Sequence, residues 1–229
     1  MAVKVGILGT GVVGQTLAGK LTELGYPVTI GTRDVSKTMA NTDRNPYGGA
    51  PFAEWHKQYG QVKLGTFAEA ARFGDIIFIC TNGAATLDAV KQTKLDNIKG
   101  KTVVDISNPL DFSRGMPPSL FSQWVNTNSL GEEIQKALPG ANVVKSLNIV
   151  NCEVMVNPRK SNGDPTMFVA GNDAKAKDEV KEILKQFGWT DIIDLGDISG
   201  ARGMEMVLPF WLRIWGATKN GYFGFKIVR

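Results

Sequence analysis

Short apolar runs alternate with amphipathic segments along most of this chain. Segments between the runs carry apolar residues at helical spacing, and Asp173–Phe187 is the clearest of them. Strands that alternate with helices are typical of a mainly parallel sheet covered on both faces. The pattern therefore predicts a doubly wound α/β fold. Eight runs are expected to form strands: Val3–Leu8, Val28–Ile30, Val62–Leu64, Asp75–Cys80, Thr102–Ile106, Val143–Leu147, Met167–Ala170 and Asp191–Leu195.

Local signals mark the ends of two of the expected helices. Gly25 is expected to end the helix after the first strand, because glycine readily adopts the left-handed conformation that closes a helix. Thr66 and Glu69 have the spacing of a capping box, which predicts a short helix that begins there. The apolar face of the first helix is expected to consist of Val13, Leu17, Leu21 and Leu24.

Two polar, turn-rich stretches interrupt the alternation. Asn41–Ala50 is rich in Asn, Gly and Pro, and Asn108–Asn128 contains Pro109, Pro117 and Pro118, so we expect both to be insertions. A boundary near residue 150 is expected to divide the chain into a larger unit, residues 1–150, and a smaller α/β extension, residues 151–229.

Composition narrows the class of protein. The 229 residues are 43% hydrophobic and 21% charged, as in ordinary globular proteins. The two cysteines lack metal-ligand spacing, so we expect no metal site, and they fit a reducing cytoplasm. A net charge of +4 without a dense basic tract indicates no nucleic-acid partner. Because Val207–Ala217 is too short to cross a bilayer and no leader is recognisable, we expect neither a membrane span nor export.

A glycine-rich turn follows the first expected strand and opens the first expected helix. In this G-x-G-x-x-G context, Gly9 permits a tight turn, Gly11 lets the backbone approach a pyrophosphate, and Gly14 lets helix and strand pack closely. The helix N-terminus adds unpaired N–H groups for an anion. The turn therefore predicts a Rossmann-type dinucleotide site, formed by Gly9, Thr10, Gly11, Val12, Val13 and Gly14.

The end of the second strand indicates which dinucleotide is bound. An NAD site usually presents an acidic residue here, whereas this chain reads Gly31-Thr32-Arg33. Gly31 is expected to leave room for a 2′-phosphate, and Thr32, Arg33 and Lys37 are expected to hold it. These residues favour NADP(H). The alternative is that Asp34 holds the ribose as in NAD sites.

Polar residues follow the later strands, at the edge where a ligand of a parallel sheet lies. We expect them to surround the ribose and nicotinamide, although each could instead cap a local loop. The fourth strand contributes Cys80, Thr81 and Asn82, the fifth Ile106, Ser107, Asn108 and Pro109, and the sixth Ser146, Leu147 and Asn148.

No catalytic acid or base stands out in the sequence. His56 is the only histidine, and its position in a polar excursion between strands predicts a surface or packing role. The catalytic residues are therefore unknown. Hydride transfer can proceed without such a group, because alignment of donor and acceptor supplies much of the rate.

The motifs Gly9–Gly14 and Gly31–Arg33 resemble the NADPH-dependent reductases of the deazaflavin coenzyme F420 and the cytosolic domains of membrane metalloreductases. The resemblance extends to a terminal glutamate-containing helix, Ala201–Glu205, and a short strand, Gly224–Ile227. A bacterial branch of dinucleotide-binding proteins is more similar still, through Asn108–Phe112, Asn126–Glu132 and Phe187–Trp189. The resemblance implies NADPH with a deazaflavin- or flavin-like acceptor. It implies that Thr10–Val13 hold the pyrophosphate, that Thr32, Arg33 and Lys37 hold the 2′-phosphate, and that Thr81, Ile106–Pro109 and Leu147 lie near the nicotinamide. Asn148 replaces a histidine of the archaeal enzymes.

The acceptor and the assembly remain open from the sequence. A conjugated small-molecule acceptor, a small carbonyl or imine substrate, and a non-catalytic NADPH-binding role are all compatible with it. Gly200–Arg229 carries more apolar surface than one core-facing stripe needs, including Trp211. We expect this segment to cover the acceptor side of the cleft and to contribute to a homodimer.

Overall fold

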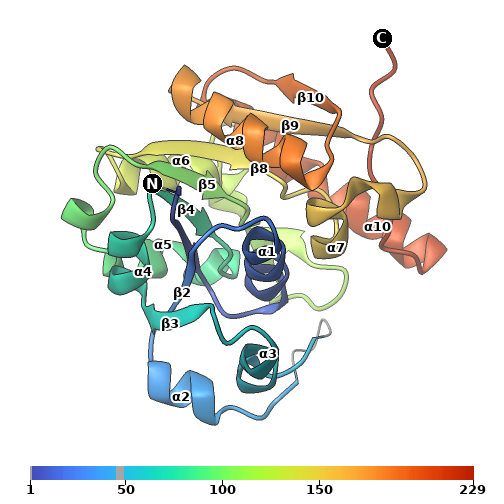
Figure 1. Ribbon diagram of the computed structural model, residues 1–229. Helices are drawn as coiled ribbons and strands as arrows, with labels where there is room; N and C mark the ends of the chain where they lie inside the picture. Colours follow the sequence, from blue (N-terminus) through green and yellow to red (C-terminus); the bar gives the residue numbers. More distant parts are fainter. Residues whose placement is uncertain (1, 45–48) are drawn as a thin grey trace.

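The computed structural model describes residues 2–44 and 49–229, so positions 45–48 of the expected Asn41–Ala50 insertion lie outside it. One sheet organises the chain, in the order β10-β9-β8-β5-β4-β1-β2-β3 (Figure 1). Its strands are β1 (Val5–Leu8), β2 (Val28–Thr32), β3 (Lys63–Thr66), β4 (Ile76–Ile79), β5 (Thr102–Asp105), β8 (Asn142–Ser146), β9 (Thr166–Gly171) and β10 (Asp191–Asp194). All eight predicted strands are confirmed.

Six strands run parallel and their ends are in register. Leu8 pairs with Gly31 and with Ile79, and Asp105 pairs with both Ile79 and Lys145. The segments that follow β1, β2, β4, β5 and β8 therefore emerge at one edge of the sheet. β9 is antiparallel to β8, and β10 follows the direction of β9, so the predicted mainly parallel sheet is confirmed with a reversal at one side.

Helices cover both faces of the sheet, as the alternating pattern predicts (Figure 1). One apolar core contains Leu17, Val154 and Val180, from α1, α7 and α8. The other contains Ala70, Ala89 and Ile134, from α4, α5 and α6. The helices are α1 (Val12–Glu23), α2 (Val35–Ala40), α3 (Phe52–Gln58), α4 (Phe67–Phe73), α5 (Gly83–Gln92), α6 (Leu130–Ala137), α7 (Cys152–Val156), α8 (Ala174–Phe187), α9 (Ala201–Met206) and α10 (Leu208–Thr218).

The predicted helix signals are present in the structure. The capping box of α4 forms with both of its bonds, because the Thr66 hydroxyl accepts from the Glu69 N–H and the Glu69 carboxylate accepts from the Thr66 N–H. Gly25 follows α1 with φ +86°, a conformation that favours glycine. The sequence alone locates these ends because each signal lies within four residues.

Two short-range details differ from the predictions. The stretch Asn108–Asn128 contains a small antiparallel sheet, β6 (Leu110–Asp111) and β7 (Ser119–Leu120), which was not predicted. The strand expected at Gly224–Ile227 is wrong. That segment makes one backbone–backbone bond, from the Thr166 N–H to the Phe225 carbonyl, and the Ile227 N–H donates to the Thr166 hydroxyl; Phe225 also packs against the core. One such bond does not make a β-ladder.

Candidate functional site

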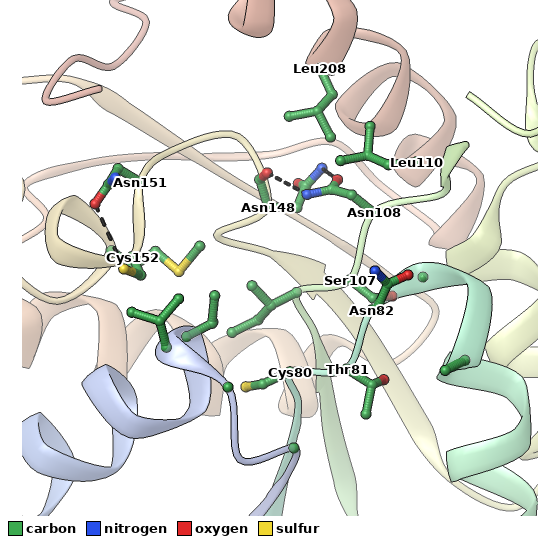
Figure 2. A pocket seen from close by; sticks show the side chains of 18 of the residues that line it. Cys80, Thr81, Asn82, Ser107, Asn108, Leu110, Asn148, Asn151, Cys152 and Leu208 are labelled. Atoms are coloured by element: carbon green, nitrogen blue, oxygen red, sulfur yellow. Dashed lines mark hydrogen bonds between the residues drawn. The ribbon is translucent and has the colours of Figure 1, made fainter. Parts of the chain in front are cut away.

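A cavity of about 840 Å³ lies at the carboxyl-terminal ends of the parallel strands (Figure 2). The glycine-rich turn, the ends of β2, β4, β5 and β8, and helix α10 all contribute to its walls. Most predicted site residues line it: Gly9, Thr10, Gly11, Val12, Val13, Thr32, Arg33, Cys80, Thr81, Asn82, Ile106, Ser107, Asn108 and Asn148. Gly14, Lys37, Pro109 and Leu147 are outside the lining.

The glycine-rich turn has the geometry of a phosphate cradle. Gly9 has φ +122°, and a Cβ there would lie 2.8 Å from the Cys80 carbonyl oxygen. A Cβ on Gly14 would lie 2.1 Å from the Gly9 carbonyl oxygen, so Gly14 serves the close packing of α1 on the turn rather than the cavity itself. Gly11 precedes α1 and offers no side-chain cap. The N–H groups of the first turn of α1 are thus left for an anion.

The end of β2 presents one cation to the cavity. Among the described residues, no group accepts a hydrogen bond from the exposed Arg33 guanidinium. Asp34 caps α2 by accepting from the Lys37 N–H at 2.9 Å, which gives the carboxylate a structural role. Lys37 is 88% exposed and does not line the cavity. Arg33, directly after β2, is therefore the basic side chain that lines the site here.

Gly31 was expected to leave room for a 2′-phosphate, but it lies against helix α4. A Cβ on Gly31 would lie 2.9 Å from the Ala70 Cβ and 3.0 Å from the Phe67 Cα, both in α4. The missing side chain at position 31 therefore lets α4 pack on the sheet and does not make room for a phosphate. Thr32, which is next in the chain, lines the cavity and shares a hydrogen bond with Thr38 at 2.7 Å.

The end of β4 combines local capping with a place in the cavity wall. The Asn82 side chain accepts from the Ala84 N–H, and the Thr81 and Thr86 hydroxyls share a hydrogen bond of 2.8 Å. Burial raises the pKa of the Cys80 thiol, so that side chain stays protonated and behaves as a small apolar group. These residues shape the wall without supplying an acid or base.

Asn108, which is half-buried, and Asn148, which is buried, form a hydrogen-bonded pair after the ends of β5 and β8 (Figure 2). The Asn148 amide N–H donates to the Asn108 side-chain oxygen and to the Met204 carbonyl, both at 2.9 Å. The Asn108 amide donates back to the Asn148 carbonyl at 2.9 Å. Leu147, just before, is fully buried with φ 62°, so the turn after β8 is left-handed. Leu147, which was expected beside the nicotinamide, therefore does not line the cavity.

Beneath this wall lies a buried ionic network, made by Asp105, Lys145 and Glu205, whose side chains are fully buried. The Lys145 ammonium lies 2.9 Å from the Asp105 carboxylate and 2.8 Å from the Glu205 carboxylate, and donates to the Ser107 carbonyl. Asp105 also accepts from the N–H and hydroxyl of Ser107. The network therefore fixes the cavity-lining turn at Ser107 from below.

Burial and the neighbouring charges shift the pKa values of Lys145 and Glu205. Burial alone would lower the pKa of Lys145, but the adjacent carboxylates outweigh it and raise that pKa. Burial raises the pKa of Glu205 against the opposing effect of Lys145. Glu205 accepts from the N–H groups of Leu130 and Gly131, at the start of α6. Sequence reasoning missed this network because its members are far apart in the chain.

Helix α10 and the Asn108–Asn128 stretch complete the cavity opposite the glycine-rich turn. Trp211 stacks on Phe223 with ring centroids 5.0 Å apart, and its indole N–H is buried without a partner among the described residues. Leu208, Leu212 and Trp215 also line the cavity, as expected for the segment Gly200–Arg229. Further lining residues were not predicted: Phe67, Gly83, Ala85, Ala89, Leu110, Phe112, Met116, Pro118, Val150, Asn151, Cys152 and Met155. Most of them are apolar and they are scattered along the chain, so they left no local signal.

His56 lies away from the cavity, in α3. Its Nε2 donates to the Val62 carbonyl at 2.7 Å, and its ring stacks on Phe52. The predicted packing role of His56 agrees with these contacts.

Comparisons with known proteins agree with this geometry. The family described as NADP oxidoreductase, coenzyme F420-dependent, matches residues 4–109. A crystal structure from Arthrobacter sp. FB24, assigned as an F420-dependent NADP reductase, is 49% identical, covers 100% of both chains and has a TM-score of 0.93. The F420-dependent NADP reductase of Methanothermobacter marburgensis is 26% identical and shares 92% of each chain. Metalloreductase STEAP3 of Rattus norvegicus is 28% identical over 92% of this chain, which spans 38% of that protein.

The fold, the phosphate cradle and the full-length likeness converge. No helix in the described part of the chain is long and apolar enough to span a membrane. The chain belongs to the family of coenzyme F420-dependent NADP oxidoreductases and is an NADP-dependent, hydride-transferring oxidoreductase.

Proposed function

We propose that this protein transfers hydride from NADPH to a planar, conjugated acceptor of the deazaflavin or flavin type. The observation that carries the proposal is one continuous cavity lined by the phosphate cradle at one side and by the aromatic helix α10 at the other. Such a cavity can hold a dinucleotide and a flat second ligand together. The printed names of the family and of the Methanothermobacter relative support coenzyme F420 as that ligand.

The residues present fit NADP(H). The Gly9–Gly14 turn has no room for side chains at Gly9 and Gly14, and the start of α1 leaves N–H groups unpaired for the pyrophosphate. Arg33 is a free cation beside Thr32 and suits a 2′-phosphate. Lys37, in the first turn of the following helix α2, is exposed and would add positive charge on this side of the phosphate. Thr10–Val13 would hold the pyrophosphate, and Thr81, Ser107 and Asn108 would border the nicotinamide ribose.

The chain contributes alignment and a dry environment to the reaction. NADPH supplies the hydride when bound, and the acceptor takes the hydride together with a proton from solvent. Trp211 and Trp215 on α10 offer flat apolar surface against which the acceptor would stack. Ile106 and Leu208 are apolar residues of the lining and would help to exclude water when both ligands are bound. Rate then comes from holding donor and acceptor within about 3–3.5 Å.

Consumption of NADPH with a panel of acceptors tests this function. We expect turnover with coenzyme F420 or with a flavin, and much slower turnover with a small ketone or a cyclic imine. Fast imine or ketone reduction with inert planar acceptors would contradict the proposed acceptor. Tight NADPH binding without turnover on any acceptor would instead indicate a non-catalytic NADPH-binding protein.

We also propose that the protein is a homodimer and is located in the cytoplasm. Phe210 is 59% exposed and Trp215 39% exposed on α10, which supports a homodimer formed through this helix. Light scattering of the protein and of a Phe210→Asp variant tests the dimer, and a monomeric parent protein would contradict it. Both cysteines are free thiols, which is consistent with a reducing cytoplasm.

A further inference from the structure

We propose that the side-chain oxygen of Asn148 accepts a hydrogen bond from the carboxamide N–H of the nicotinamide ring, and so recognises the reactive end of the cofactor. This inference rests on the proposed NADP(H) site. It assigns a specific polar contact to a cavity wall that is otherwise mostly apolar.

The orientation of the Asn148 amide is fixed by its partners. The Met204 carbonyl can only accept a hydrogen bond, so the amide nitrogen of Asn148 must face it, at 2.9 Å. The Asn108 amide nitrogen faces the Asn148 carbonyl, which also can only accept. The Asn108 side-chain oxygen is therefore the acceptor for the second N–H of Asn148. Both amides have one permitted orientation, and the Asn148 oxygen is left over.

That oxygen accepts no hydrogen bond from any part of the chain that the structure describes. Asn148 is 2% exposed and lines the cavity, and no described residue donates to its side-chain oxygen. A buried acceptor without a partner costs free energy that a ligand donor would recover. Three buried side-chain atoms of the described residues have no partner, and two of them are on residues that line this cavity, Asn148 and Trp211. The unpaired atoms thus gather where a ligand is expected.

The sheet order places Asn148 at the nicotinamide end of a bound dinucleotide. β1, which carries the phosphate cradle, lies between β2 on one side and β4, β5 and β8 on the other. Arg33 follows β2, whereas Asn108 and Asn148 follow β5 and β8. A dinucleotide crosses the sheet edge with its two nucleosides on opposite sides of the cradle. With the 2′-phosphate at Arg33, the nicotinamide lies on the side of Asn148.

The backbone before Asn148 supports a functional placement. Leu147 has φ 62°, a left-handed conformation that is rare for a branched apolar side chain. Strain of this kind persists where surrounding contacts impose it, and it concentrates at ligand sites. Here the turn brings the Asn148 side chain between Asn108 and α9.

The chemistry of the ligand follows from the free oxygen, which needs a donor. In the nicotinamide half of NADP(H), the carboxamide supplies the N–H donors, and the ribose hydroxyls supply O–H donors. An analogue that replaces the carboxamide by an acetyl group, 3-acetylpyridine adenine dinucleotide phosphate, removes only the N–H donors. It therefore separates the proposed contact from a contact with the ribose.

Equilibrium binding of NADP⁺ and of the acetylpyridine analogue, measured by calorimetry, tests the contact without any acceptor. We expect the wild-type protein to bind NADP⁺ about 3- to 10-fold more tightly, the range of one neutral hydrogen bond. Asn148→Leu should reduce this ratio to about 1. Adenosine 2′,5′-bisphosphate, which lacks the nicotinamide half, should bind both proteins equally and so reports an intact phosphate end.

Asn97→Leu is the matched control, because the Asn97 amide also donates to two backbone carbonyls, those of Ala68 and Thr93, but does not line the cavity. We expect this variant to keep the wild-type ratio. Equal affinity of the wild-type protein for NADP⁺ and the analogue would overturn the inference even if Asn148→Leu fails to fold, as would a wild-type ratio retained in Asn148→Leu. Absence of NADP⁺ binding to the wild-type protein would instead overturn the proposed function, and this inference with it.

Discussion

The two ends of the cavity are built from different kinds of contact. At the phosphate end, Gly9, Gly14 and Arg33 lie within 25 residues of one another, and short-range sterics fix the turn. At the acceptor end, Asn148 bonds to Asn108 and to Met204, which are 40 and 56 positions away in the chain. One end is a local motif, and the other is a product of the tertiary fold.

This difference explains which cofactor contacts a sequence can reveal and which it cannot. The phosphate end needs particular residue types at fixed spacing, because a Cβ or an acid in the wrong place blocks the ligand. The acceptor end needs only that distant segments meet, so its residues can vary as long as the tertiary contacts hold. Substitutions at the two ends should therefore fail in different ways.

The largest expected effect is on stability, at the acceptor end. Lys145→Met removes the only ammonium between two buried carboxylates, Asp105 and Glu205. Breaking a buried pair on one side typically costs about 3–5 kcal/mol of unfolding free energy. Urea denaturation measures this change.

A matched control is Lys185→Met, because Lys185 pairs with Glu182 on the exposed surface of α8. That variant should lose less than about 1 kcal/mol. Equal losses in the two variants would mean that the buried network does not hold the acceptor end together.

The second effect is on cofactor choice, at the phosphate end. Arg33→Ala removes the cation that faces the cavity beside Thr32. A hydrogen bond to a charged group is worth about 1.5–3 kcal/mol, so NADPH should bind roughly 10- to 150-fold more weakly. NADH, which lacks the 2′-phosphate, should bind almost as before. Calorimetry with both cofactors decides the matter, and an equal loss for both would rule out the assigned role.

The sequence predicts the parts of the molecule that local contacts build, and it misses parts that distant contacts build. The eight strands, the α4 capping box and the Gly9–Gly14 turn were predicted, because apolar periodicity, capping and glycine spacing act within a few residues. The β6–β7 pair was missed, since two-residue strands carry no periodicity. Gly31 was interpreted for its place near a phosphate, whereas the structure shows that it contacts α4.

The acceptor wall was only partly predictable for a related reason. The apolar surplus of residues 200–229 pointed to a second role for Trp211, which lines the cavity. Leu147 was expected beside the nicotinamide but is buried, because the left-handed turn presents Asn148 instead. The partners of Lys145 could not be found from spacing, since Glu205 lies 60 residues later.

The third effect concerns the acceptor alone. Trp211→Ala removes the ring that stacks on Phe223 and lines the cavity. Aromatic contacts contribute about 0.5–1.5 kcal/mol, so the KM for the acceptor should rise roughly 2- to 12-fold while NADPH affinity stays unchanged. Trp211→Phe keeps a ring and should lose less. Steady-state kinetics with both variants provides the measurement, and unaltered acceptor KM in Trp211→Ala would leave this helix as plain core.

The smallest effect is a pH dependence of the melting temperature, which arises from the contacts of Asp191. Hydrogen bonds from Thr166, and then from Lys226 and Arg229, hold the pKa of Asp191 well below its ordinary value of 3.8. A lowered carboxyl pKa stabilises the fold above that ordinary value, and the contribution is lost as the pH falls through the folded-state pKa. The melting temperature should therefore fall in acid.

Asp191→Asn should make this acid-induced decrease less steep, because the variant has no carboxylate to protonate. Thermal unfolding of both proteins between about pH 5 and pH 2 checks the sign. A steeper acid dependence in the variant would contradict the role assigned to the Asp191 contacts.

The position of Glu205 late in the chain has a consequence for how the protein assembles during its synthesis. Lys145 and Asp105 precede Glu205 in the chain, and so do the N–H groups at the start of α6 that bind its carboxylate. We therefore expect these groups to form a binding site for the carboxylate, into which α9 docks late in folding. Contacts made late in folding retard unfolding more than they accelerate folding. A Glu205→Ala protein should therefore fold at nearly the normal rate and unfold faster, because α9 would no longer be held by this carboxylate.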